Sequence, residues 1–321
     1  MTSATLREPT LRRLWDASPW LTATGLLMLG LLAAAVAGLW LDPRTITGAP
    51  AWLKPAKFAA SIAIYTLTLA WVFTYLPDRP RMRRWVGVIS AVVFVIEIAI
   101  IDLQAWRGTT SHFNNGTTLD AVLFSIMGAG IAIQTLTSIA AAIALWRHRF
   151  GDRPLGWAFR LGMTITIVGA LSGGLMTRPT ASQFDAMRRG GAAPVVGAHT
   201  VGAPDGGRGL PGTNWSVEHG DLRVPHFLGL HALQAFALLA LALRGRRWSE
   251  SVQVRLVQTA AVSYGSLYVL LLWQALRGQS IAAPDASTLV ALAAWLLATA
   301  AGCMLAARPS SRPLSEGMVT L

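Results

Sequence analysis

The hydrophobic residues of this chain fall into long continuous runs, separated by short segments rich in arginine, glycine and proline. Each run is close to the ~20 residues that an α-helix needs to cross ~30 Å of hydrocarbon. Irregular backbone cannot leave its polar groups unpaired in lipid, so each run should be helical. The pattern predicts an all-α polytopic transmembrane bundle of about eight spans, over residues 20–41, 57–76, 85–105, 119–145, 157–177, 226–243, 256–276 and 286–307.

Arginines gather in alternate connecting segments, which predicts the orientation. One set of segments, which includes both termini, carries Arg7, Arg12, Arg13, Arg79, Arg81, Arg83, Arg84, Arg147, Arg149, Arg153, Arg160, Arg244, Arg246, Arg247, Arg255, Arg308 and Arg312. Short cytoplasmic loops are enriched in Lys and Arg. We therefore expect a cytoplasmic segment 1–19, a single transmembrane domain 20–307 and a cytoplasmic tail 308–321, in a bacterial-type cytoplasmic (inner) membrane.

The Gly- and Pro-rich segment 178–225 is the long loop on the opposite, extracytoplasmic side. Its composition predicts an irregular and partly mobile excursion with no domain of its own. The first apolar run is about 20 residues long, longer than the 7–15 residues of a signal-peptide core, so we expect it to be a retained span.

Composition agrees with the membrane interpretation. The chain has 321 residues, of which 53% are hydrophobic and 13% are charged, and its mean hydropathy is +0.49. Soluble domains carry about 25% charged residues, so an ordinary soluble fold is excluded. The net charge of +12 lies in short turns between apolar runs, which does not suit a nucleic-acid-binding face. The single cysteine, Cys303, rules out an intramolecular disulfide.

Ionisable residues inside a span are costly, so they mark candidate sites. Glu97 lies seven residues before Gln104 in the third span, which places both on one helix face. The sixth span opens with Asp221 and Arg223 and continues through His226, His231 and Gln234. We treat this span as one regular helix, in which His231 and Gln234 share a face.

Other polar residues also gather near the extracytoplasmic ends of the spans. The only two lysines, Lys54 and Lys57, begin the second span and continue into a polar stripe that includes Tyr65. Further candidates at this side are Arg107, His112, Arg178 and Gln274. Gly162 with Thr166, and Gly169 with Gly173, are small residues at fourfold spacing, which favour close helix packing.

Two named architectures can be compared with these residues. The eight spans and cytoplasmic termini resemble haem A synthase, but spans two, four and eight carry no histidine to serve as an axial ligand. The residue types of Ser111, His112, Asp120, His226 and His231 resemble those of a membrane zinc hydrolase of the alkaline ceramidase type. The His-x-x-x-His pair that places two ligands on one helix face is missing here.

The sequence therefore predicts an outward-facing polar pocket for a small anionic or lipid-like ligand or a metal centre, in a membrane-embedded enzyme or redox protein. Glu97, His226 and His231 are the candidate catalytic residues, and His112, His226 and His231 the candidate metal ligands. No motif specifies a cofactor, and haem and zinc are the two that these residue types could hold. The candidate ligand-binding residues are Lys54, Lys57, Tyr65, Gln104, Arg107, Arg178, Asp221, Arg223, Gln234 and Gln274. A proton-coupled transporter using Glu97 and a non-catalytic accessory membrane protein are the alternatives. The expected partners are the lipid bilayer and a small-molecule or lipid ligand, and no nucleic acid.

Overall fold

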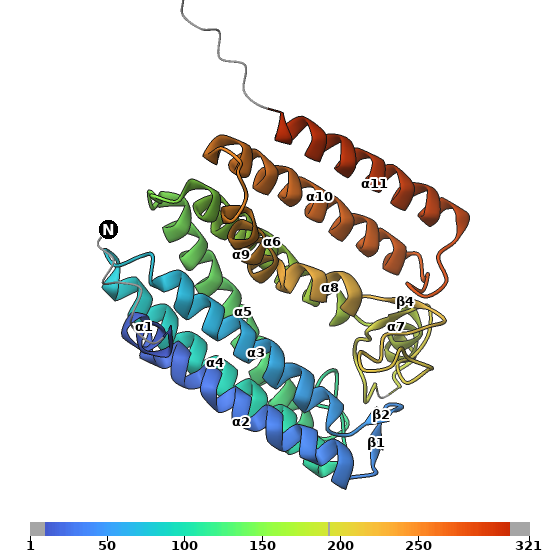
Figure 1. The fold of residues 1–321 in the computed structure, drawn as a ribbon. Helices are drawn as coiled ribbons and strands as arrows, with labels where there is room; N and C mark the ends of the chain where they lie inside the picture. The colour runs from blue at the N-terminus through green and yellow to red at the C-terminus, as the bar shows by residue number, and fades with distance from the viewer. Residues whose placement is uncertain (1–9, 192, 309–321) are drawn as a thin grey trace, which may run out of the picture.

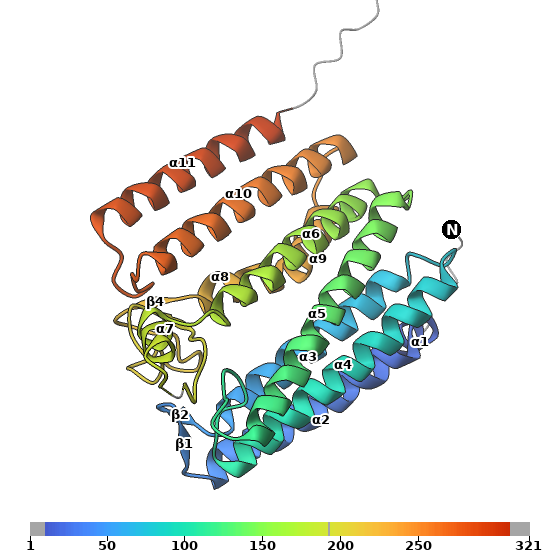
Figure 2. The same cartoon turned by 180° about the vertical axis from the view of Figure 1, so that it is seen from behind.

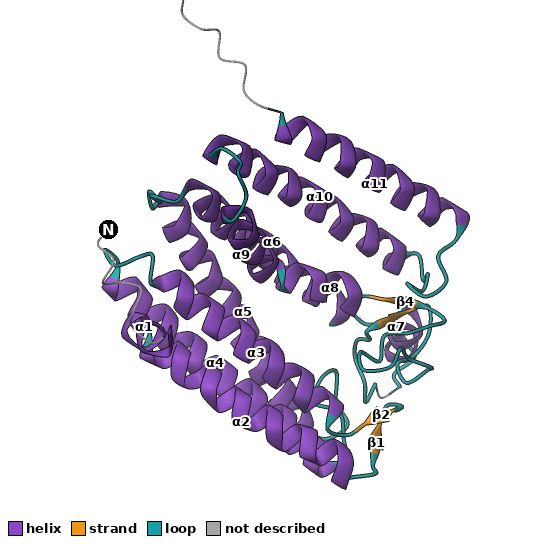
Figure 3. Cartoon of the chain, in the orientation of Figure 1, coloured by secondary structure: helices purple, strands orange, loops and turns teal. Residues whose placement is uncertain are grey.

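The computed structural model describes residues 10–191 and 193–308. Helices account for nearly all of its regular structure (Figure 3). In chain order they are α1 (Thr10–Ala17), α2 (Pro19–Leu41), α3 (Leu53–Phe73), α4 (Pro80–Arg107), α5 (Thr118–Arg147), α6 (Arg153–Met176), α7 (Ala181–Arg188), α8 (Arg223–Leu230), α9 (Ala232–Arg244), α10 (Glu250–Leu276) and α11 (Ala286–Ala307). Two short antiparallel pairs join β1 (Thr45–Ile46) to β2 (Ala49–Pro50), and β3 (Thr200–Val201) to β4 (Gly220–Asp221).

The all-α polytopic bundle is confirmed. In the described residues, seven helices are long and apolar enough to cross a membrane, and the count is eight if α8 and α9 form one bent span. Proline occupies the first turn of α2, α4 and α6, where its missing N–H costs no hydrogen bond. The boundaries differ from the predicted ones by a few residues, mainly because polar residues such as Lys54 and Arg107 extend the helices beyond the apolar runs.

The helices form two groups that meet along α5 and α6 (Figures 1 and 2). Helices α2 to α5 pack together, and α6 packs with α8, α9 and α10, with α11 against α10. We call the end with the connections 74–79, 148–152 and 245–249 the arginine end. The opposite end, with 42–52, 108–117, 177–222 and 277–285, is the loop end. Both ends of the described chain lie at the arginine end (Figure 1).

The largest apolar core lies in the arginine half of the bundle. It joins residues from α3, α5, α6, α9 and α10, including the fully buried Phe73, Leu145, Phe159 and Val257, with Phe236 almost fully buried. Aromatic rings of Trp71, Tyr75 and Phe159 meet edge to face within it. The two helix groups are therefore closed against each other at this end, whereas charged residues enter the interior at the loop end.

Helix α6 packs very closely on α8 and α9, as the small residues predict. A Cβ added to Gly229 would lie 2.4 Å from the Cα of Gly169, and one added to Gly162 would lie 2.8 Å from the Cα of Leu233. A Cβ at Gly173 would lie 3.0 Å from the His226 ring. Glycine is therefore required for this backbone approach, and the packing expectation is confirmed.

The sixth span is not the regular helix that we expected. It breaks at His231, and α8 and α9 are bent by 47°. Thr166 of α6 bonds to both sides of the break: its Oγ1 accepts from the Leu233 amide at 3.2 Å and donates to the Leu230 carbonyl at 3.4 Å. Tyr264 of α10 donates to the Leu228 carbonyl at 2.6 Å. Side chains of neighbouring helices thus satisfy backbone groups that lipid could not.

The long loop is more structured than its composition predicts. It contains α7, β3 and β4, and Thr180 with Gln183 forms a capping box at the start of α7. The amide of Val196 donates to the Phe113 carbonyl and the amide of Ala198 to the Met176 carbonyl, each at 2.9 Å. Most of the segment still lies outside helices and strands, as expected of an irregular excursion, and these hydrogen bonds connect it to the adjoining helices and connections.

Candidate functional site

Three ionisable side chains, those of Lys54, His112 and Glu97, lie in a row that enters the bundle at the loop end; we call them the Lys54–His112–Glu97 row. Lys54, near the start of α3, has its Nζ 2.9 Å from Nδ1 of His112, in the connection between α4 and α5. The other ring nitrogen of His112, Nε2, lies 3.7 Å from Oε1 of Glu97 in α4. Glu97 is only 2% exposed, and its Oε1 has no hydrogen-bond partner among the described residues.

The donors around His112 suggest its tautomer. Lys54 and the Ser111 hydroxyl, at 3.1 Å, both approach Nδ1, which therefore accepts and leaves the proton on Nε2, facing Glu97. Burial lowers the pKa of His112 well below its usual range, and Lys54, His199 and His226 lower it further. His112 is accordingly neutral, and it connects the Lys54 amino group to a buried carboxyl group.

A histidine–aspartate pair lies in the long loop beside the Lys54–His112–Glu97 row. Nδ1 of His199 is 2.6 Å from Oδ2 of Asp205. Asp205 also accepts the backbone amides of His199, at 3.0 Å, and of Thr200, at 2.9 Å. These bonds fix the carboxylate, so His199 donates from Nδ1 and keeps Nε2 as a proton acceptor.

The electrostatics of the pair support a neutral imidazole beside an ionised carboxylate. Burial lowers the pKa of His199, and the positive charges of Arg223 and Lys54 lower it further. The hydrogen bond and charge of Asp205 oppose this lowering. Burial alone would raise the pKa of Asp205, but the hydrogen bond and charge of His199 and the two amides outweigh it and lower the pKa. A neutral imidazole oriented by an ionised carboxylate is the arrangement of a general base.

Phe113 lies between the two groups. Its ring centroid is 4.9 Å from that of His199 and 6.1 Å from that of His112. Its φ is +62°, a left-handed conformation that is rare for a bulky residue and costs on the order of 1–3 kcal/mol. The bond from Val196 to its carbonyl and the burial of its ring hold this conformation. Backbone strain of this kind occurs at functional sites more often than elsewhere.

His226, in α8, is the third histidine of the group. Its Nδ1 is 2.8 Å from the Gly169 carbonyl and 3.4 Å from the Ser172 hydroxyl. The carbonyl can only accept, so the proton is on Nδ1 and Nε2 is an acceptor. Electrostatic interactions link His226 to His112 and His199.

The cations Lys57 and Arg223 bind the long loop. Nζ of Lys57 donates to the Thr213 carbonyl at 2.7 Å. Arg223 donates to both oxygens of Asp221 and to the Asn214 carbonyl. These predicted ligand-binding residues therefore lie near the candidate site, but their hydrogen bonds hold the loop segment 213–221 in position.

Several predicted site residues lie in separate polar contacts. Gln104 and Arg107 both bond to Asp120 of α5, at 2.8 and 2.6 Å. Tyr65 pairs with Ser138 at 3.0 Å, deeper between α3 and α5. Gln274 donates to the Ser280 carbonyl at 2.9 Å. These residues link helices or hold a turn.

Three further candidates lie outside the group around His112 and His199. Arg178 is exposed. His231 lies at the helix break with its ring 4.4 Å from that of Phe227. Both polar atoms of the Gln234 side chain are buried without a hydrogen-bond partner among the described residues. The break at His231 removes the regular helix on which the shared face of His231 and Gln234 depended.

The residues do not form the expected metal site. Across residues 10–191 and 193–308, no three or more His, Cys, Asp or Glu side chains are grouped so that they could hold a metal ion. His226 directs Nδ1 to Gly169, whereas Nδ1 of His112 faces Lys54. The contacts with the Gly169 carbonyl and with Lys54 therefore occupy one ring nitrogen of each histidine.

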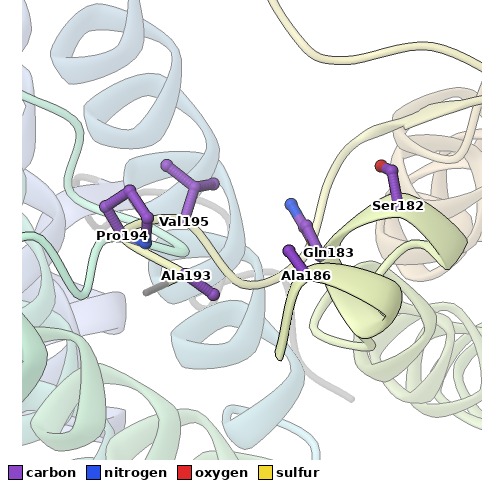
Figure 4. Close-up of a pocket in the computed structure, with 6 residues that line it drawn as sticks. All are labelled: Ser182, Gln183, Ala186, Ala193, Pro194 and Val195. Atoms are coloured by element: carbon purple, nitrogen blue, oxygen red, sulfur yellow. The ribbon is translucent and has the colours of Figure 1, made fainter. Parts of the chain in front are cut away.

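A shallow hollow also lies at the loop end, between α7 and the segment 193–195 (Figure 4). Its lining residues are Ser182, Gln183, Ala186, Ala193, Pro194 and Val195. None of them is ionisable, so this hollow offers no acid–base chemistry, and the candidate site remains the group around His112 and His199.

The sequence reasoning missed His199 and Asp205. Both lie in the Gly-rich segment, where neither helical periodicity nor a metal-binding spacing marks them. The available signal was residue type: the chain has only six histidines, and His199 precedes an acidic residue by six positions in a turn-forming segment.

Comparison with known proteins gives no relative: no family model, curated protein or solved structure matches this chain.

Proposed function

We propose that this chain is a membrane-embedded enzyme whose site at the loop end faces the extracytoplasmic side and acts by general acid–base catalysis on a lipid-like molecule. The observation that carries the proposal is the His199–Asp205 pair, held beside the Lys54–His112–Glu97 row. The orientation rests on the arginine-rich connections, which favour a cytoplasmic arginine end. The membrane would be of the bacterial cytoplasmic type.

In this proposal His199 is the general base. Its Nε2 accepts a proton from water or from a substrate hydroxyl, while Asp205 holds the imidazole and stabilises the imidazolium that forms. His199 has 22% of its side chain exposed, and the substrate would approach it from the loop end. Lys54 and Glu97, on either side of His112, would exchange a proton with the developing product or stabilise its charge.

The ligand class follows from the charges and from the surface. Arg223 is paired with Asp221, and Lys57 is bound to a carbonyl, which weakens the expectation of a strongly anionic ligand. Exposed apolar side chains surround the loop end, including Phe184 and Met187 on α7 and Phe227 on α8. Such side chains enter the membrane interface, where a lipid-like substrate would be available laterally.

A proton-coupled transporter is the second candidate, favoured by one observation. Glu97 is a buried carboxyl group with an unpartnered oxygen beside Lys54 and His112, which suits reversible protonation. A transporter must also open toward the arginine end, where the apolar core around Phe73, Phe159 and Phe236 joins the two helix groups. The enzyme proposal needs no such opening.

The test uses the full chain purified into nanodiscs made from total bacterial membrane lipid, with lipids followed over time by mass spectrometry. A lipid species should be consumed and a product should appear. Because a general base contributes about 10²–10⁴-fold, His199→Gln should lower the rate at least ~100-fold. Asp205→Asn should also lower it strongly, by disturbing the tautomer of His199. His219→Gln, in the same loop, is the matched control and should retain the rate.

The proposal fails if the wild-type chain changes no lipid, or if His199→Gln turns over at the wild-type rate. Proton-coupled uptake into vesicles that Glu97→Gln abolishes would establish the carrier in its place. Unchanged lipids without uptake would favour the accessory role.

A further inference from the structure

A second hollow lies at the arginine end, far along the bundle from the site above. It is lined by Arg149, Phe150, Arg153, Trp157 and Arg160, and it has a volume of about 280 Å³. Ligand sites commonly occupy ~300–1,000 Å³, so there is room for a small polar group and none for a whole lipid. The hollow is formed by the connection from α5 to α6 and the first turns of α6.

Arg160 builds the floor of this hollow. Its Nε donates to the Leu145 carbonyl at 3.1 Å and its Nη2 to the His148 carbonyl at 2.6 Å, which caps the end of α5. Its guanidinium carbon lies 5.4 Å from the Phe150 ring centroid and 5.6 Å from that of Trp157. The guanidinium is therefore fixed among aromatic rings by bonds from two of its nitrogens.

The rim of the hollow is positively charged. Arg149 and Arg153 are exposed at its edge. Arg153 approaches Glu250 only loosely, at 3.8 Å, and the carboxylate of Asp152 bonds to Arg244. Three arginines thus line one small hollow, and the Asp152 carboxylate next to it is already paired.

The surroundings place this charge at a membrane surface. Trp146 and Trp157 stack edge to face with centroids 5.8 Å apart, at the ends of two spanning helices. Tryptophan is enriched where headgroups meet hydrocarbon. Ile143, one turn deeper on α5, is 46% exposed and offers an apolar surface along which an acyl chain can lie.

We propose that this hollow binds the phosphate group of an anionic phospholipid, with Arg149 and Arg153 donating to the phosphate oxygens above Arg160. Guanidinium groups match phosphate in charge and geometry, and basic pockets between helices bind anionic headgroups. A free phosphate ion has the same chemistry but lacks the acyl chain that would contact Ile143. The site lies at the opposite end from His199, so it stands or falls independently of the proposed enzyme function.

Native mass spectrometry of the purified full chain tests this proposal. Dioleoyl phosphatidylglycerol should be retained in preference to dioleoyl phosphatidylcholine. Arg149→Gln with Arg153→Gln should lower the retained phosphatidylglycerol about thirtyfold, since each of the two arginines near an anionic surface contributes on the order of 1 kcal/mol. Arg246→Gln with Arg247→Gln removes the same charge from exposed positions at the same end, and this control should retain the lipid.

Equal retention of the two lipids by the wild-type chain would overturn the proposal. An equal loss in both double variants would also overturn it, because it would show general charge attraction. If inorganic phosphate binds the wild-type chain as tightly as phosphatidylglycerol does, the acyl chain contributes nothing, the site binds free phosphate, and the lipid assignment is wrong.

Discussion

The hydroxyl group of Thr166 bonds to both sides of the break in the sixth span, which makes Thr166→Val an informative change. Valine keeps the shape of threonine and removes the oxygen that accepts from Leu233 and donates to Leu230. Thr166 is 3% exposed and lies within the bundle, so no water replaces these bonds. The packing contribution to the free energy of unfolding should be nearly unchanged.

The expected loss follows from the two unpaired backbone groups. Hydrogen bonds between membrane helices contribute about 0.6 kcal/mol each on average and up to ~1.7 kcal/mol. The bonds at 3.2 and 3.4 Å are long, so Thr166→Val should lower the free energy of unfolding by roughly 1–3 kcal/mol. Straightening the span would not restore the bonds cheaply, because Gly229 is in backbone contact with Gly169.

Denaturant titration of the chain in bicelles measures this loss. Thr135→Val is the matched control, because its hydroxyl donates only to the Ile131 carbonyl of its own helix, which keeps its backbone partner. The control should change the free energy of unfolding by a few tenths of a kcal/mol at most. If the two variants are equally stable, Thr166 does not stabilise the break.

Three further predictions concern packing, pH and the long loop. Gly229→Leu should prevent folding or lower thermal stability severely, whereas Gly174→Ala should be tolerated because the space at its Cβ is open. Size-exclusion profiles and melting temperatures measure this, and the prediction is contradicted if both variants behave alike. The pKa of His199 is lowered from 6.5 in the folded chain, so the unfolded chain binds more protons below that pH, and stability should fall from pH 7 to pH 5. His199→Gln should make this decline in melting temperature shallower, and an unchanged slope would refute the assignment. Lys57→Met removes the hydrogen bond to the Thr213 carbonyl, so amide hydrogen exchange in 205–217 should accelerate while exchange in α3 stays unchanged. Equal protection of 205–217 in the wild type and the variant would show that the bond does not hold the loop.

Most of the fold could be predicted from the sequence, because its signals are local. Apolar runs of near-constant length specify the spans, and the small residues Gly162, Gly169 and Gly173 indicate the closest helix contact. The break at His231 could not be predicted, since the bonds that permit it come from Thr166, 65 positions earlier in the chain. A regular helix was the simplest expectation for an uninterrupted apolar run.

The candidate site was predicted only in part. The cost of burying charge identifies Glu97, and the rarity of lysine in this chain identifies Lys54; the two do lie on either side of His112. Burial cost does not distinguish a site from a helix contact, and Gln104 and Arg107 instead bond to Asp120. His199 and Asp205 reach the site through loop geometry, and loop geometry depends on hydrogen bonds between distant segments such as that from Val196 to Phe113.

Labelling of a single cysteine from one side of the membrane tests most directly whether the site can be reached from outside. Cys303 is the only cysteine, so Cys303→Ala gives a background without thiols. On that background His199→Cys should react with a membrane-impermeant maleimide in intact cells, and Arg246→Cys only after permeabilisation. The reverse pattern, or a thiol at position 199 that reacts only after the protein is denatured, would contradict an acid–base site open to the extracytoplasmic side.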